Sequence, residues 1–166
     1  MNSNIILLNG PSSSGKSTLA RELQKILIEK KKVYEIVSID DFLAMTTEDV
    51  IYEDDVFEIS PKLCEKVLEH LETKRGVIID HVITSERIFE QLIEMLSAYS
   101  ICLVHVTCPV EVLKQREAER GNRCLGSAEA SFEYLYPKEG YDVTIDTYEL
   151  SLDRGCFRIL EAIGAK

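Results

Sequence analysis

The sequence contains no tryptophan, only four prolines and eight glycines, and no long uninterrupted apolar run. A membrane-spanning helix needs about 18 or more consecutive apolar residues, so we expect no transmembrane segment. The apolar stretch in NIILLNG is too short for a secretory signal peptide and ends at a glycine. We therefore expect a cytoplasmic location. Repeats and linkers are also lacking, which predicts one domain over residues 1–166.

Positive charge is scarce as well, because 19 lysines and arginines stand against 29 acids and give a net charge of −10. This balance argues against a nucleic-acid-binding surface, which needs a basic face. The five cysteines show no CxxC spacing. We interpret them as reduced thiols that act as small core residues rather than as disulfides or a zinc site.

Five short runs rich in isoleucine and valine alternate with helical patterns. Their near-continuous apolar character is typical of strands that are covered on both faces of a parallel sheet. We therefore predict a three-layer α/β fold with strands at 4–8, 34–38, 76–80, 101–106 and 142–146.

Helix starts and stops are also visible between these runs. Ser60 with Pro61 predicts the N-cap and first turn of one helix, and Thr84 can cap another. The apolar spacing predicts further helices over 16–30 and about 151–163, with Gly164 as a stop.

The segment GPSSSGKST, residues 10–18, fits the pattern G-x-x-x-x-G-K-[ST] without a gap. Glycine lets the backbone curl so that N–H groups point at phosphate oxygens. Lys16 adds a positive charge, and the Ser17 hydroxyl can bind Mg²⁺. The sequence thus predicts a nucleoside triphosphate site made by Gly10, Pro11, Ser12, Ser13, Ser14, Gly15, Lys16, Ser17 and Thr18.

Several classes of P-loop protein do not fit. The sequence has neither the N-K-x-D nor the D-x-x-G pattern of a GTPase, and helicases or transporters need a larger body. The remaining common class of P-loop protein that fits this sequence is a small kinase. It needs an acceptor pocket, a base for the acceptor hydroxyl and a lid that carries arginines.

Acids follow two of the predicted strands at their carboxyl ends, where parallel sheets bind ligands. We expect Asp40 to face the site as the catalytic base and Asp41 to cap the next helix or touch the substrate. Asp80 ends a Walker B-like strand and can hold Mg²⁺ or the acceptor. His81 is a candidate substrate contact, with a structural hydrogen bond as the alternative.

A lid is predicted at about 109–140. Arg116 and Arg120 are four residues apart on one helical face, and Arg123 follows a Gly-Asn turn. Guanidinium groups suit phosphoryl oxygens whose charge changes during transfer, so all three are candidate catalytic residues.

Taken together, these segments resemble the chloramphenicol phosphotransferase-like family of P-loop small-molecule kinases. The resemblance covers most of the chain and depends on IILLNGPSSSGKST, IDDFL, VIIDHV, REAERGNRCLGSA, GYDVTIDT and LSLDRGC. It implies strand order 2-3-1-4-5, ATP with Mg²⁺, and transfer of the γ-phosphate to a hydroxyl. The family's base matches Asp40, and its lid arginines match Arg116, Arg120 and Arg123. Asp146 and Thr147 are implied to lie near the adenine.

The acceptor side departs from the family. Ser131 and Tyr136 stand where the family often has glutamine and histidine, and Tyr136 is a candidate substrate contact. Residues 41–75 contain ten acids and four bases, and no arginine occurs before the end of that stretch. An anionic acceptor would need a cationic clamp there. We therefore expect a neutral or cationic hydroxyl compound, with Phe42, Met45, Tyr52 and Phe57 as apolar walls.

Two alternatives stay open at this point. One is a nucleoside or nucleotide kinase of the same architecture, and the other is an ATP-binding regulatory module without an acceptor. The sequence also leaves open whether an antibiotic is phosphorylated and whether the chain forms a homo-oligomer.

Overall fold

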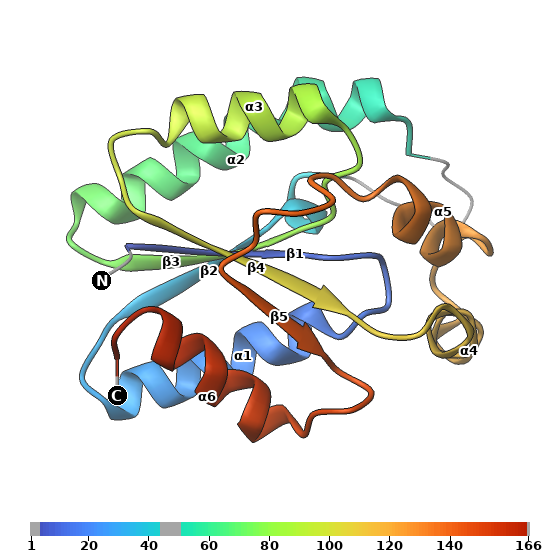
Figure 1. Ribbon diagram of the computed structural model, residues 1–166. Helices are drawn as coiled ribbons and strands as arrows, with labels where there is room; N and C mark the ends of the chain where they lie inside the picture. The colour runs from blue at the N-terminus through green and yellow to red at the C-terminus, as the bar shows by residue number, and fades with distance from the viewer. Residues whose placement is uncertain (1–3, 44–50, 166) are drawn as a thin grey trace.

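The computed structural model describes residues 4–43 and 51–165. In these ranges five parallel strands form one sheet in the order β2-β3-β1-β4-β5 (Figure 1). The strands are β1 (Ile5–Asn9), β2 (Tyr34–Ser38), β3 (Gly76–His81), β4 (Ile101–Thr107) and β5 (Val143–Asp146). The predicted α/β class, parallel sheet and strand order are confirmed.

The middle strand β1 is buried along its whole length. Ile5 is paired with Val77 of β3 and with Ile101 of β4, so β1 has a hydrogen-bonded neighbour on each side. Because successive side chains of a strand point to opposite faces, a strand covered on both sides must be apolar at every position. This explains the uninterrupted run in IILL.

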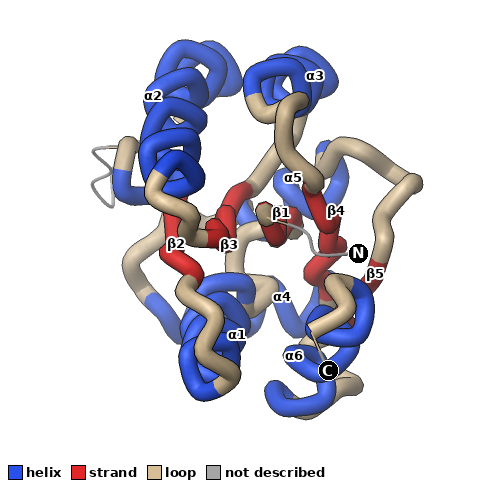
Figure 2. Tube along the Cα trace, turned by 90° about the vertical axis from the view of Figure 1, so that its left-hand side faces the viewer, coloured by secondary structure: helices blue, strands red, loops and turns tan. Residues whose placement is uncertain are grey.

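Helices cover both faces of the sheet (Figure 2). α1 (Lys16–Glu29) and α6 (Leu152–Ala162) pack on one face, and α2 (Glu53–Glu72) and α3 (Glu86–Met95) on the other. The short helices α4 (Val110–Arg120) and α5 (Ser127–Tyr134) lie beyond the carboxyl ends of the strands (Figure 1).

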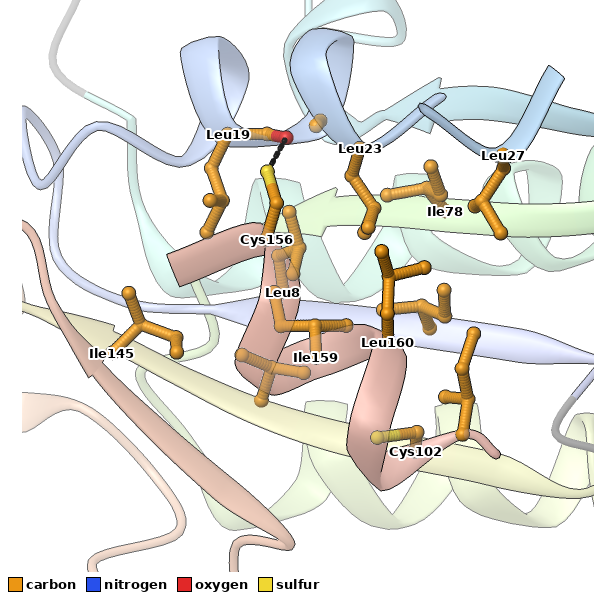
Figure 3. Close-up of a cluster of buried hydrophobic side chains, with 14 of the residues drawn as sticks. Leu8, Leu19, Leu23, Leu27, Ile78, Cys102, Ile145, Cys156, Ile159 and Leu160 are labelled. Atoms are coloured by element: carbon orange, nitrogen blue, oxygen red, sulfur yellow. Dashed lines mark hydrogen bonds between the residues drawn. The ribbon is translucent and has the colours of Figure 1, made fainter. Parts of the chain in front are cut away.

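The core on the α1 and α6 face is a single buried cluster (Figure 3). Leu8 and Ile78 of the sheet meet Leu23 of α1 and Ile159 of α6 there. Cys156 lies in the same cluster, with its Sγ 4.0 Å from the Leu19 carbonyl oxygen. All five cysteines are free and only Cys124 is exposed, which confirms the expected thiols.

The predicted start of α2 is wrong. The helix begins at Glu53, seven residues before the predicted N-cap Ser60, which is buried, and Pro61 lies inside the helix. The missing N–H of a proline interrupts only one helical bond. Arg87 of α3 stabilises the first turns of α2 by two contacts. It donates a 2.6 Å hydrogen bond to Glu53, and its guanidinium lies 4.1 Å from the centre of the Phe57 ring.

Two smaller boundary predictions also differ. Ser85, not Thr84, caps α3, because its hydroxyl accepts from the Ile88 N–H. Asp41 does not begin a helix. It lies in the short 3-10 helix Ile39–Asp41, whose N-cap is Ser38. Every helix in the described ranges is too short or too polar to traverse a bilayer.

Candidate active site

The P-loop joins β1 to α1 and depends on two glycines. A Cβ on Gly10 would lie 2.0 Å from the Val106 carbonyl oxygen, so no side chain fits there. Gly15 has a φ of 96°, in the left-handed region. It also precedes α1 without a side-chain cap, which leaves the first N–H groups of that helix directed at a ligand.

Lys16 lies under this loop and is 6% exposed. Its Nζ donates to the Pro11 carbonyl oxygen at 2.9 Å, within the loop itself. Burial lowers the pKa of Lys16 to about 8, although the nearby Asp80 and Asp40 carboxylates oppose this change. The ammonium group is therefore charged at neutral pH and poorly solvated, which strengthens its attraction to a phosphate.

The two predicted metal ligands are in contact. The Ser17 hydroxyl donates to Asp80 Oδ2 at 2.6 Å, which joins the start of α1 to the end of β3. A hydroxyl and a carboxylate are oxygen donors of the kind that Mg²⁺ prefers. The described residues contain no cluster of three metal-binding side chains. The pair therefore fits an ion that takes its other ligands from water and phosphate.

Arg116 of α4 reaches back to the P-loop. Its guanidinium donates to the Ser13 and Ser14 carbonyl oxygens at 3.4 and 3.3 Å and to Thr147 Oγ1 at 2.9 Å. The Thr147 hydroxyl donates in turn to Ser14 at 2.6 Å. Arg116 thus connects the lid helix, the P-loop and the end of β5, and much of its hydrogen-bonding capacity is used by protein atoms.

The other two lid arginines differ from Arg116 and from each other. Arg123 Nη2 donates to Asp40 Oδ2 at 2.5 Å, and this pair bridges the lid and the 3-10 helix after β2. Arg120 is exposed at the end of α4, and its guanidinium makes no hydrogen bond within the described residues. The structure therefore leaves Arg120 free to contact a ligand.

One cavity of about 1350 Å³ brings most of the predicted residues together. Ser12, Ser13 and Gly15 to Thr18 of the P-loop line it, as do Asp40, Asp80, Arg116, Arg120 and Arg123. The other three residues of the P-loop do not line the cavity, namely Gly10, Pro11 and Ser14.

The far side of the cavity is formed by segments 39–43, 51–56 and 82–84, and we call it the acceptor wall. Its lining residues are Ile39, Asp40, Leu43, Ile51, Glu53, Val56, Val82 and Thr84. The aromatic wall expected from the sequence is not found in the described residues. Phe57 packs under Arg87, and Tyr52 and Phe42 do not line the cavity. Met45 lies outside the described residues.

Three predicted substrate contacts lie away from the cavity. Asp41 is exposed to solvent, and the Tyr136 hydroxyl donates to Glu86 of α3 at 3.2 Å. His81 is completely buried, and neither ring nitrogen has a hydrogen-bond partner among the described residues. Burial lowers the pKa of His81 to about 4, so its ring is neutral at physiological pH.

Two contacts of the lid were not predicted. The Ser131 hydroxyl of α5 accepts from the Ser12 N–H at 2.9 Å and so joins the lid to the P-loop. The buried Glu117 carboxylate accepts from the Gly126 and Ala128 N–H groups at 3.0 and 2.8 Å and fixes α5 against α4. The only sequence signal for the first contact is that Ser131 departs from the family pattern.

Comparison with solved structures defines the class of fold. The APS kinase of Mycobacterium tuberculosis in complex with AMPPNP and APS is 15% identical with a TM-score of 0.79, and the match covers 98% of each chain. A gluconokinase from Sinorhizobium meliloti 1021 is 17% identical with a TM-score of 0.76, over 98% of this chain and 93% of that one. A sugar kinase from Janibacter sp. HTCC2649 is 21% identical with a TM-score of 0.75, over 98% and 95%.

The chain thus has the fold of the P-loop kinases. No curated protein matches the sequence. The model of the family described as chloramphenicol phosphotransferase-like protein matches residues 3–163, and the chain belongs to that family. Family and fold together support a phosphotransferase of the P-loop kinase class.

Proposed function

We propose that this protein transfers the γ-phosphate of ATP to a hydroxyl group of a neutral or cationic small molecule. The observation that carries the proposal is the placement of Asp40 in the same cavity as Lys16, Asp80 and the lid arginines. A carboxylate, a P-loop and arginine side chains around one space are the parts that phosphoryl transfer to an alcohol requires.

The donor side would hold the triphosphate through the P-loop N–H groups and Lys16. The β- and γ-phosphates would replace the Pro11 carbonyl oxygen as partners of the Lys16 ammonium group. Ser17 and Asp80 would hold Mg²⁺, which when bound neutralises part of the phosphate charge. Arg120 would contact the transferring phosphoryl group, because its guanidinium makes no hydrogen bond with any described residue.

On the acceptor side, Asp40 would orient the hydroxyl and take its proton. The hydroxyl oxygen attacks the γ-phosphorus, the bond from this phosphorus to the β–γ bridging oxygen breaks, and ADP leaves. The hydrogen bond from Arg123 Nη2 to Asp40 Oδ2 holds the carboxylate in place at the edge of the cavity. Oδ1 of Asp40 or an Oδ2 released by Arg123 would be the accepting atom.

The charge of the acceptor wall supports a neutral or cationic acceptor. Within the described residues the wall carries the carboxylates of Asp40 and Glu53 and no lysine or arginine. Leu43, Ile51 and Val56 supply apolar surface beside them. An anionic acceptor would find no lysine or arginine on the described part of this wall, while an uncharged alcohol would need only Asp40 and the apolar contacts.

A transfer assay with γ-labelled ATP tests this proposal against its alternatives. Neutral alcohols, aminoglycosides, sugars, nucleosides and nucleoside monophosphates are offered as acceptors, and labelled product is counted. Label on an uncharged or cationic alcohol supports the proposal. Preferred label on a nucleoside monophosphate would overturn it in favour of a nucleotide kinase. If ATP and ADP bind but no hydroxyl compound accepts label, the protein is a regulatory module.

A further inference from the structure

Backbone strain is confined to two places in the described chain. Three residues other than glycine have a clearly positive φ, namely Ser13 at 69°, Lys31 at 58° and Lys74 at 62°. A side chain in this left-handed region crowds the neighbouring carbonyl oxygen and costs folding free energy, and such strain gathers at functional sites. Ser13 belongs to the P-loop. The two lysines lie together at the opposite end of the strands.

Lys31 and Lys74 occupy equivalent positions in the fold. Each follows the C-cap residue of its helix, Lys30 for α1 and Thr73 for α2. Helices most often place glycine or asparagine here, because those residues adopt the left-handed conformation easily. The chain then enters β2 and β3, which are adjacent strands, so the two corners lie at the amino ends of these strands, the end that faces the viewer in Figure 2.

A cavity of about 520 Å³ lies between these corners, and we call it the basic cavity. Lys31, Lys32, Lys74 and Arg75 line it, and none of the described residues that line it is an acid. Its walls also include the apolar side chains of Val33, Leu71 and Ile163. Four basic residues therefore line one hollow in a chain whose net charge is −10.

Most of this charge is not neutralised by the protein. Arg75 donates to Glu35 at 2.8 Å, but Lys31, Lys32 and Lys74 form no salt bridge within the described residues. Other lysines do pair, for example Lys66 with Glu69 at 2.8 Å. The carboxyl ends of α1 and α2 attract cations, which accounts for positive charge at these corners. They do not account for lysine at two positions where glycine would be less strained.

We propose that the basic cavity binds a small oxyanion with two or more negative charges, a phosphate or a polycarboxylate. Such a ligand would relieve the mutual repulsion of the lysines and give the Arg75 guanidinium a second partner. The volume lies within the range of small-molecule sites, and the apolar walls can accept a short carbon skeleton. The site is separate from the P-loop and does not depend on the proposed catalysis.

Nuclear magnetic resonance titration of the ¹⁵N-labelled protein tests this site directly. Backbone amides 30–34 and 73–76 report on the basic cavity, while amides 10–18 report on the P-loop, so one titration separates the two. Inorganic phosphate, a phosphate monoester and citrate are added against chloride at equal ionic strength. We expect saturable chemical-shift changes of the amides at the basic cavity. The anion that binds most tightly shows whether the cavity prefers a phosphate or a polycarboxylate.

The matched variants are Lys31→Gly/Lys74→Gly and the control Lys25→Gln/Lys62→Gln, which removes the same charge from exposed helix surfaces. The first should weaken binding at the cavity roughly tenfold or more, and the control should leave it nearly unchanged. The first should also raise the melting temperature of the free protein, because strain and repulsion are removed. If the glycine variant does not fold, Lys31→Asn/Lys74→Asn replaces it.

Two results would overturn the proposal. One is the lack of saturable shifts at residues 30–34 and 73–76 with any of the three anions. The other is binding that the lysine variants leave as tight as in the parent protein.

Discussion

The two halves of the candidate active-site cavity hold charge in opposite ways. On the donor side, Lys16 and Arg120 carry positive charge that no carboxylate neutralises by a direct salt bridge in the described residues. On the acceptor side, the charge of Asp40 is matched by Arg123 at 2.5 Å, and the charge of Glu53 by Arg87. One half is therefore prepared to receive an anion. The other half has its charges already paired and offers apolar surface.

The largest expected effect is on the donor side. Lys16→Ala should reduce kcat/KM by about a thousandfold and weaken ATP binding, because a buried ammonium group beside the phosphates is lost. Lys25→Ala, on the exposed face of the same helix, is the matched control and should change neither. Calorimetric binding of an ATP analogue and steady-state turnover measure the two quantities. Unaltered ATP binding in Lys16→Ala would contradict the assigned role of the lysine.

A smaller effect should separate two arginines of the same helix. Arg120→Ala should lower kcat by about a hundredfold without changing stability, because its guanidinium makes no hydrogen bond within the described chain. Arg116→Ala should instead lower the free energy of unfolding by about 1–3 kcal/mol, because it breaks the bonds to the P-loop and Thr147.

Denaturant unfolding and turnover of both variants check this difference between the arginines. Equal losses of stability in Arg116→Ala and Arg120→Ala would remove the distinction that the hydrogen bonds suggest.

A pH effect concerns His81, which is buried at the end of β3 and does not line the cavity. Burial lowers the pKa of His81 to about 4, whereas an unfolded histidine titrates near 6.5. Between these pH values only the unfolded state binds the proton, so acidification favours unfolding. From pH 6.5 to 4 the wild type should lose about 3 kcal/mol more stability than His81→Gln. Parallel pH profiles for the two proteins would show that His81 is not held neutral.

The donor half could be predicted from the sequence because its geometry is local. Residues 10–18 are contiguous, and the roles of Gly10 and Gly15 follow from the backbone path that the motif imposes. The sheet was predictable for a similar reason, since strands buried on both faces leave uninterrupted apolar runs such as residues 5–8.

The acceptor half is assembled from three separate segments, and no local pattern reports how they meet. The true start of α2 depends on Arg87, which lies more than 30 residues away and holds Glu53 and Phe57. Once that helix begins at Glu53, Phe57 packs under Arg87 and Ile51 and Val56 form the wall instead. Tyr136 and His81 do not line the cavity, because contacts distant in sequence hold Tyr136 against Glu86 and bury His81 at the end of β3.

The central claim is that Asp40 is the base for the acceptor hydroxyl, and its neighbour Asp41 provides the control. Both are acids of one 3-10 helix, but only Asp40 lines the cavity. Single-turnover transfer of label from γ-labelled ATP should fall at least about a hundredfold in Asp40→Asn, with ATP binding retained, and stay near wild type in Asp41→Asn. Normal transfer in Asp40→Asn, or an equal loss in Asp41→Asn, would contradict the account.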